Sequence, residues 1–79
     1  MREGKLIYNG SSDRFDLQYR GGGDNGGFHC GDTVDVKIDG QWVGTRFESR
    51  EDVAGGWYLV GLEDISPAYV AYMGLPVRG

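Results

Sequence analysis

The feature that most constrains the fold is an alternation of apolar and polar side chains that recurs in several short runs of the chain. Residues 14–19 read Arg-Phe-Asp-Leu-Gln-Tyr, and residues 33–38 read Thr-Val-Asp-Val-Lys-Ile. Successive side chains on a β-strand point to opposite faces, so a period of two places one face in a core and the other in water. The pattern therefore predicts a mainly β structure built from half-buried strands.

Turn-forming residues between these runs predict antiparallel hairpins. Asp39 and Gly40 tolerate the positive φ angles of a tight type I′ turn, so the runs on either side of them should pair. The polar stretch at 9–13, which is rich in Asn, Gly, Ser and Asp, should form another turn. Together these signals predict strands at residues 5–8, 14–19, 33–38, 41–49 and 57–60.

The C-terminal tail departs from the alternation and predicts a short helix. Ser66 can cap the helix, a proline occupies its first position, and Gly74 follows its end. We expect about two turns of helix, with Val70 and Met73 docked on the sheet. Residues 75–78 should then return as a short edge strand, because a proline is tolerated at a sheet edge.

Length and element pattern together predict the fold class. We expect residues 1–79 to form one small β domain. We expect the fold to be a small, strongly bent antiparallel sheet or an SH3-like barrel of five to six strands, with one short helix near the C-terminus. A core of this size rarely provides more than about 3–5 kcal/mol, so such folds often rely on a disulfide, a metal or a second subunit.

Cysteine content and charge limit the environment and the partners. The single cysteine, Cys30, excludes a disulfide within the chain and favours a reducing compartment, so we expect a cytoplasmic protein. No run approaches the roughly 18 apolar residues of a membrane span, so no membrane partner is expected. The formal net charge of −4 disfavours direct nucleic-acid binding and favours a basic protein partner, although a modest negative charge also keeps small proteins soluble.

One segment suggests metal chemistry, because it contains the only histidine and the only cysteine. His29 and Cys30 are neighbours, and Asp24 and Asp32 flank them. Zinc binds imidazole, thiolate and carboxylate ligands, and a structural zinc would stabilise so small a fold. The paired Cys or His spacing of known zinc sites is missing, however, so a buried cysteine beside a hydrogen-bonded histidine is the alternative. A Cys–His nucleophile needs a geometry that sequence neighbours rarely have, so we expect no enzymatic activity.

Five sequence runs resemble a family of short uncharacterised proteins from bacteria, their prophages and their mobile elements. The runs are Gly-Gly-Phe-His-Cys-Gly-Asp at 26–32, Ile-Asp-Gly-Gln-Trp-Val at 38–43, Thr-Arg-Phe-Glu at 45–48, Trp-Tyr-Leu-Val-Gly-Leu at 57–62 and Gly-Leu-Pro-Val-Arg at 74–78. The resemblance implies a compact sheet with the His-Cys turn between strands, and no established enzymatic role. Such proteins are similar in size and charge to the anti-CRISPR inhibitors of phages, which bind and block a nuclease.

Our leading hypothesis is therefore a non-enzymatic phage or mobile-element accessory protein that inhibits a host defence nuclease, such as a CRISPR nuclease, by blocking nucleic-acid loading. Aromatic residues make up 13% of the chain, and exposed Tyr and Trp often anchor interfaces, although they could also simply cover a thin barrel. The candidate partner-binding residues are Glu48, Glu51, Asp52, Trp57, Glu63, Asp64, Tyr69 and Tyr72. The alternative is a small β-barrel adaptor or peptide-binding module, with or without a structural zinc.

Overall fold

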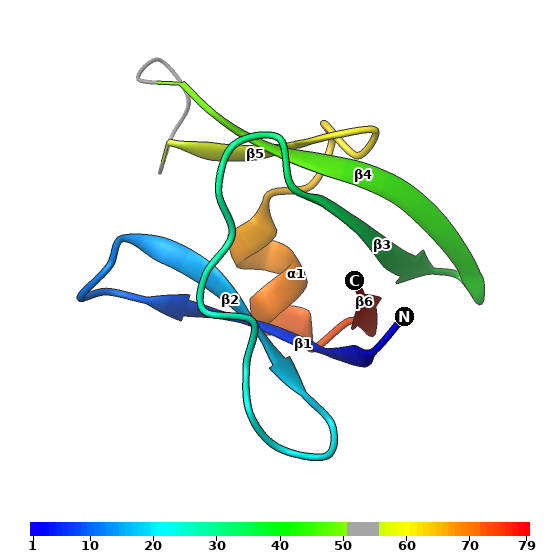
Figure 1. The fold of residues 1–79 in the computed structure, drawn as a ribbon. Helices are drawn as coiled ribbons and strands as arrows, with labels where there is room; N and C mark the ends of the chain where they lie inside the picture. Colours follow the sequence, from blue (N-terminus) through cyan, green and yellow to red (C-terminus); the bar gives the residue numbers. More distant parts are fainter. Residues whose placement is uncertain (51–55) are drawn as a thin grey trace.

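The computed structural model describes residues 1–50 and 56–79, and this part of the chain folds into one β-sheet and one α-helix (Figure 1). The strands are β1 (Glu3–Asn9), β2 (Arg14–Tyr19), β3 (Thr33–Ile38), β4 (Gln41–Ser49), β5 (Trp57–Val60) and β6 (Val77–Arg78), and helix α1 spans Pro67–Met73. The predicted mainly β fold with one short C-terminal helix is confirmed. Within the described residues, no helix has the length and apolar character needed to cross a membrane.

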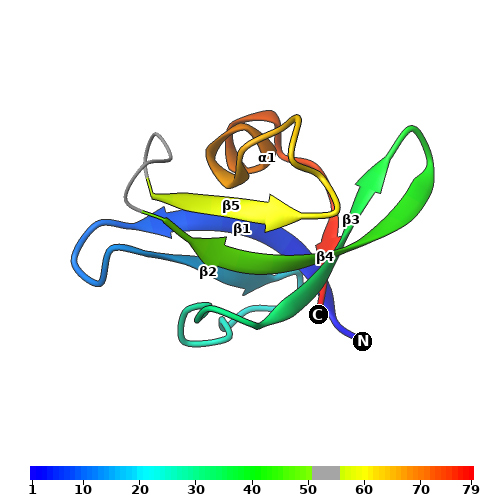
Figure 2. The same ribbon diagram turned by 90° about the horizontal axis from the view of Figure 1, so that it is seen from above.

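The six strands form a single antiparallel sheet in the order β2-β1-β6-β3-β4-β5. The sheet is strongly curled, and α1 lies in the opening between its two ends, where it contacts β1 and β5 (Figures 1 and 2). The edge strands β2 and β5 do not pair with each other within the described residues. Of the two predicted architectures, the bent sheet is therefore the observed one, and the closed SH3-like barrel is not formed.

Strand β6 corrects the prediction for the C-terminal residues. The proline predicts an edge strand, but β6 lies in the middle of the sheet between β1 and β3. Val77 is fully buried, and its Cα partners are Gly4 on β1 and Val36 on β3. Pro76 precedes the strand, and its carbonyl accepts a hydrogen bond of 2.9 Å from the backbone N–H of Lys37. Two residues at the C-terminal end thus join the two halves of the sheet.

Stacked aromatic rings organise the core inside the curl. The fully buried Phe47 of β4 lies parallel to Phe28, with ring centroids 4.6 Å apart, and stacks on Phe15 of β2 at 6.2 Å. Trp57 of β5 meets the same ring edge-on at 6.1 Å. Phe47 is consequently the residue at which the two ends of the sheet meet.

Helix α1 has the predicted caps but buries a narrower face than predicted. The Ser66 hydroxyl accepts a hydrogen bond of 3.1 Å from the backbone N–H of Tyr69, and Gly74 adopts a left-handed conformation with φ of 64°. Val70 is fully buried as expected, but Met73 is 51% exposed, so its predicted docking on the sheet is wrong. The chain turns at the C-cap, and Leu75 packs against the core instead.

The glycine-rich segment at 21–27 covers the outer edge of β2. The backbone N–H of Asn25 donates to the carbonyl of Leu17 at 3.2 Å, and the N–H of Phe28 donates to the carbonyl of Phe15 at 2.8 Å. The Asn25 side-chain oxygen also accepts a bond of 2.8 Å from the N–H of Leu17. The edge of β2 is therefore hydrogen-bonded by the protein's own chain.

Candidate functional site

The outward face of helix α1 is apolar, although it lies at the surface. None of the residues Pro67–Met73 is charged. Tyr69 is 46% exposed, Tyr72 is 86% exposed, and Met73 is exposed beside them. A surface helix normally presents charged and polar side chains to water, because only one face packs on the core. This face of α1 is thus unusual for a helix that serves only to cover a sheet.

A groove runs along one side of the helix, between α1 and the β1–β2 hairpin. The groove has a volume of about 570 Å³, and we call it the α1 groove; it is lined by Tyr8, Phe15, Ala68, Ala71 and Tyr72. The rings of Tyr8 and Phe15 form its wall and meet at 63°, with centroids 5.3 Å apart. Small alanine side chains on α1 leave this space open between the aromatic walls.

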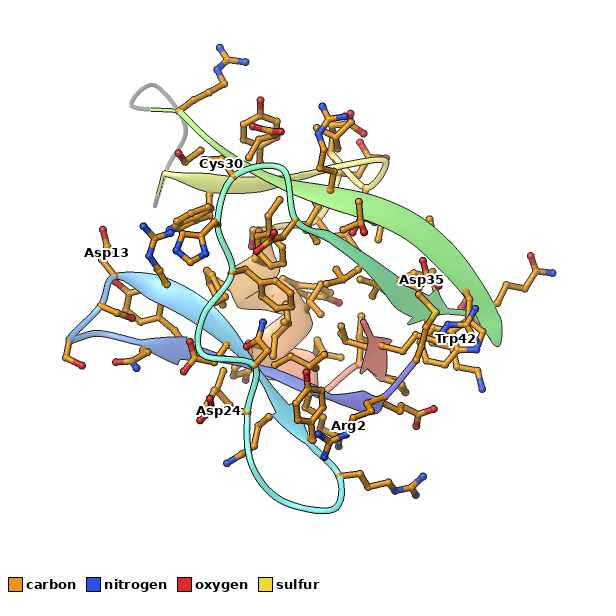
Figure 3. The ribbon with its side chains drawn as sticks, in the orientation of Figure 1. Arg2, Asp13, Asp24, Cys30, Asp35 and Trp42 are labelled. Carbon is orange, nitrogen blue, oxygen red and sulfur yellow. The ribbon has the colours of Figure 1, made fainter. Side chains whose placement is uncertain are left out.

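The tip of the β1–β2 hairpin holds Tyr8, one of the aromatic walls of the α1 groove. The Tyr8 hydroxyl donates a hydrogen bond to the carboxylate of Asp13, which lies at the hairpin turn (Figure 3). This bond, with smaller contributions from desolvation and from the negative charge of Asp13, raises the pKa of the Tyr8 phenol above its ordinary value. The Trp57 indole N–H donates to the backbone carbonyl of Asp13 at 3.1 Å, so the turn is tied to β5.

A second hollow lies on the other side of the helix, next to β5. It measures about 500 Å³, and we call it the β5 hollow; it is lined by Trp57, Tyr58, Glu63, Asp64, Ile65, Ser66 and Tyr69. The Glu63 carboxylate accepts a bond of 3.1 Å from the backbone N–H of Gly61, which holds it at the rim. Four predicted partner-binding residues are therefore brought together here, namely Trp57, Glu63, Asp64 and Tyr69.

The other predicted partner-binding residues lie apart from the β5 hollow or outside the described structure. Tyr72 lines the α1 groove across the helix. Glu48 forms an ion pair of 2.7 Å with Arg46 on β4 and lines neither hollow. Glu51 and Asp52 fall at positions 51–55, outside the described residues.

Of the four predicted metal-binding residues, the structure brings only His29 and Asp32 together. The His29 ring lies 3.9 Å from the Asp32 carboxylate, whereas the Cys30 sulfur contacts the Ser49 hydroxyl at 3.2 Å. Asp24 and Cys30 lie well apart along the β2–β3 connection (Figure 3). Within residues 1–50 and 56–79, no three His, Cys, Asp or Glu side chains could hold a metal ion. The alternative prediction of a buried cysteine is wrong, because Cys30 is exposed.

A third hollow, of about 580 Å³, lies along β1 and β2 and is lined in part by Lys5, Tyr19 and Arg20. The guanidinium of Arg2 stacks 3.8 Å from the Tyr19 ring centroid, and Arg20 faces the Glu3 carboxylate at 3.7 Å. Most of its charged groups thus already have partners. The exposed apolar residues gather instead on α1 and on the hairpin wall beside it.

Sequence reasoning identified the helix side of this site and missed the hairpin side. Leu6 and Tyr8 share one face of β1, and this spacing of two is the signal that could have placed Tyr8 beside the core. Whether it meets core or solvent depends on where α1 docks, and the local sequence does not contain that information. Nothing in the sequence indicates that Ala68 and Ala71 belong to a binding site, because alanine is common in helices; only the groove beside them shows it.

Comparison with known proteins identifies the relatives of this fold. The model of a family described as a domain of unknown function, DUF5348, matches residues 4–78. The crystal structure of a protein from Ruminococcus gnavus, a structural-genomics target, is 40% identical and has a TM-score of 0.79; the match covers 99% of this chain and 100% of that chain. No curated protein matches the chain.

Proposed function

The chain belongs to the DUF5348 family, and we propose that it is a non-enzymatic module that binds a protein partner through α1 and the two hollows beside it. We call this region the α1 surface; it comprises the exposed face of α1, the α1 groove and the β5 hollow. The observation that carries the proposal is the uncharged outward face of α1, where Tyr69, Tyr72 and Met73 are exposed to solvent.

Exposed apolar residues in this arrangement are typical of protein interfaces. Tyrosine and tryptophan supply large contact areas at low entropic cost, and they dominate the binding energy of many interfaces. Isolated apolar residues are common on any surface, but a contiguous patch around two hollows marks a binding region. Here Tyr8, Tyr69, Tyr72 and Met73 belong to one helix and the hairpin that faces it.

The narrower form of the proposal is an inhibitor of a nuclease or another nucleic-acid-handling protein. The net charge of −4, with Glu63 and Asp64 at the rim of the β5 hollow, supports a basic partner surface. A protein that binds nucleic acid offers such a surface, because it must attract phosphates. The acidic module would then compete with the nucleic acid for that surface.

An adaptor that binds an apolar peptide is the second candidate, and the α1 groove favours it. The groove lining contains no charged side chain. Binding through the groove alone would change little with ionic strength, whereas binding to a basic surface should weaken as salt screens the charges. Recovery of the partner at low and at high salt therefore separates the two candidates.

Capture of the partner by tagged variants tests the proposal. The variant Tyr69→Ser/Tyr72→Ser removes the two exposed rings of α1, and we expect it to lose the partner that the unmodified protein retains from nuclease-treated lysate. The matched control is Ile7→Ser, because Ile7 is an exposed apolar residue on β1 that lines neither hollow. Equal recovery by both variants would overturn the proposal. A retained partner with no role in nucleic-acid processing would overturn its narrower form.

A further inference from the structure

The two sides of α1 differ in chemistry, and this difference specifies the occupant of the α1 surface. Resting on the proposed function above, we infer that the partner segment carries one apolar and one basic side chain, which enter the α1 groove and the β5 hollow respectively. The groove is lined only by tyrosine, phenylalanine and alanine. The hollow combines aromatic walls with two carboxylates.

The carboxylates of the β5 hollow have no cationic partner within the described residues. Glu63 accepts a hydrogen bond from the N–H of Gly61, and neither Glu63 nor Asp64 forms an ion pair there. The nearby N-terminus of α1 favours negative charge, but it amounts to only about half a positive charge on two carboxylates. The hollow therefore keeps a net negative potential.

Two arginines approach the aromatic walls of the β5 hollow from its surroundings. The Arg14 guanidinium lies 5.8 Å from the Trp57 ring centroid, and it donates a bond of 3.0 Å to the carbonyl of Phe28. Arg50 lies 5.9 Å from the Tyr58 ring centroid. These contacts show that the rings can accept a guanidinium, while neither arginine is among the residues that line the hollow. A partner's cation that enters the hollow would contact both these rings and the carboxylates of Glu63 and Asp64.

Charge disfavours a second copy of this chain as the occupant. Two copies packed through α1 would bring two sets of the same carboxylates, Asp13, Glu63 and Asp64, into one interface. Each copy carries a net charge of −4, and like charges brought together at an interface cost free energy. A basic segment of another protein turns the same carboxylates into favourable contacts.

The width of the helix sets the spacing of the two side chains. An α-helix with its side chains is about 10–12 Å across, and an extended chain rises about 3.3 Å per residue. Side chains on the same face of an extended chain lie an even number of residues apart, so a segment that crosses α1 needs three residues between its apolar and basic anchors, a span of about 13 Å. The matched probes are the blocked pentapeptides Leu-Ala-Ala-Ala-Arg and Leu-Ala-Ala-Ala-citrulline, which differ only in the charge of the last side chain.

The test is a titration of ¹⁵N-labelled protein with each peptide, followed by NMR. The chain has two tryptophans, so the indole signal of Trp57 reports on the β5 hollow while that of Trp42, on β4, is an internal control. We expect saturable shifts at Trp57 and not at Trp42, with the arginine peptide binding about tenfold more tightly than the citrulline peptide, as one charge-assisted contact predicts. Equal affinities would overturn the inference.

Charge-matched variants complete the experiment. Glu63→Gln/Asp64→Asn should reduce affinity for the arginine peptide about tenfold, whereas Asp24→Asn/Asp39→Asn, which removes the same charge elsewhere, should have little effect. Equal losses in both variants would mean that net charge alone attracts the peptide, and the inference would fail. If Tyr69→Ser/Tyr72→Ser loses the cellular partner and Glu63→Gln/Asp64→Asn keeps it, the proposed function stands and the inference is wrong. If both variants keep the partner, the proposed function itself is wrong.

Discussion

The substitution Phe47→Ala tests the core that supports the α1 surface. Phe47 is fully buried, stacks on Phe28 with centroids 4.6 Å apart, and contacts Phe15 and Trp57 from opposite ends of the sheet. Replacing a buried phenylalanine with alanine costs about 3–5 kcal/mol, because it removes apolar contacts and leaves a cavity. A domain of 79 residues has about 3–5 kcal/mol of stability to lose. We therefore expect Phe47→Ala to be largely unfolded at 25 °C.

Urea denaturation followed by tryptophan fluorescence and far-UV circular dichroism measures this effect. The control Phe47→Leu keeps most of the buried volume, so it should cost less than Phe47→Ala and leave a cooperative transition at a lower midpoint. An unfolding midpoint of Phe47→Ala equal to that of the unmodified protein would refute the reasoning, since the ring would then not join the two ends of the sheet.

Three further predictions concern a backbone contact, a titration and a metal. At Gly4 an added Cβ would lie 2.0 Å from a backbone oxygen of β2, so Gly4→Ala should destabilise the fold by about 1–3 kcal/mol in urea denaturation; Gly21→Ala, where nothing lies within 4 Å, should be near neutral. The Tyr8 phenol should titrate above about pH 10 in a spectrophotometric titration, and Asp13→Asn should lower its pKa. The hydrogen bond between Tyr8 and Asp13 stabilises the fold fully below pH 10, and this stabilisation is lost as the pH rises through the raised pKa of Tyr8. A Tyr8 pKa that Asp13→Asn leaves unchanged would contradict Asp13 as the cause of the shift. Treatment with EDTA should leave the melting temperature unchanged, because Cys30 contacts Ser49 rather than a ligand set; a lower melting temperature would restore the zinc hypothesis.

Local sequence signals predicted most of the strands and the helix. The alternation and the Asp39-Gly40 turn identified the β3–β4 hairpin with its observed bounds. The caps at Ser66 and Gly74 likewise located α1, since capping depends on residues within one turn of the helix ends. These features are encoded by neighbours in the sequence, so no knowledge of the fold was needed to find them.

Features that depend on long-range pairing were not predictable in this way. Val77 joins β1 and β3 although it lies 41 positions after Val36 in the sequence, and the proline beside it suggested an edge. Asn25 hydrogen-bonds the edge of β2, although its glycine-rich surroundings contain no strand pattern. Both arrangements are decided by which strands meet across the sheet, and a pattern with a period of two does not specify that choice.

The candidate site was predicted in part, for a similar reason. Trp57, Glu63, Asp64 and Tyr69 were chosen for their residue types, and the approach of β5 to α1 brings them to one hollow. The opposite wall comes from Tyr8, whose exposure follows from the docking of α1 beside the hairpin. Residue type therefore pointed to binding chemistry, whereas the shape of the surface required the tertiary structure.

The dissociation constant of the captured partner for three purified proteins tests the central claim most directly. Interface anchors contribute about 2 kcal/mol or more, which corresponds to about thirtyfold in affinity. Tyr69→Ser/Tyr72→Ser should therefore weaken binding at least about thirtyfold, while Ile7→Ser binds like the unmodified protein and all three keep the same melting temperature within a few degrees. Equal dissociation constants for the three proteins would contradict the assignment of the α1 surface as the binding site.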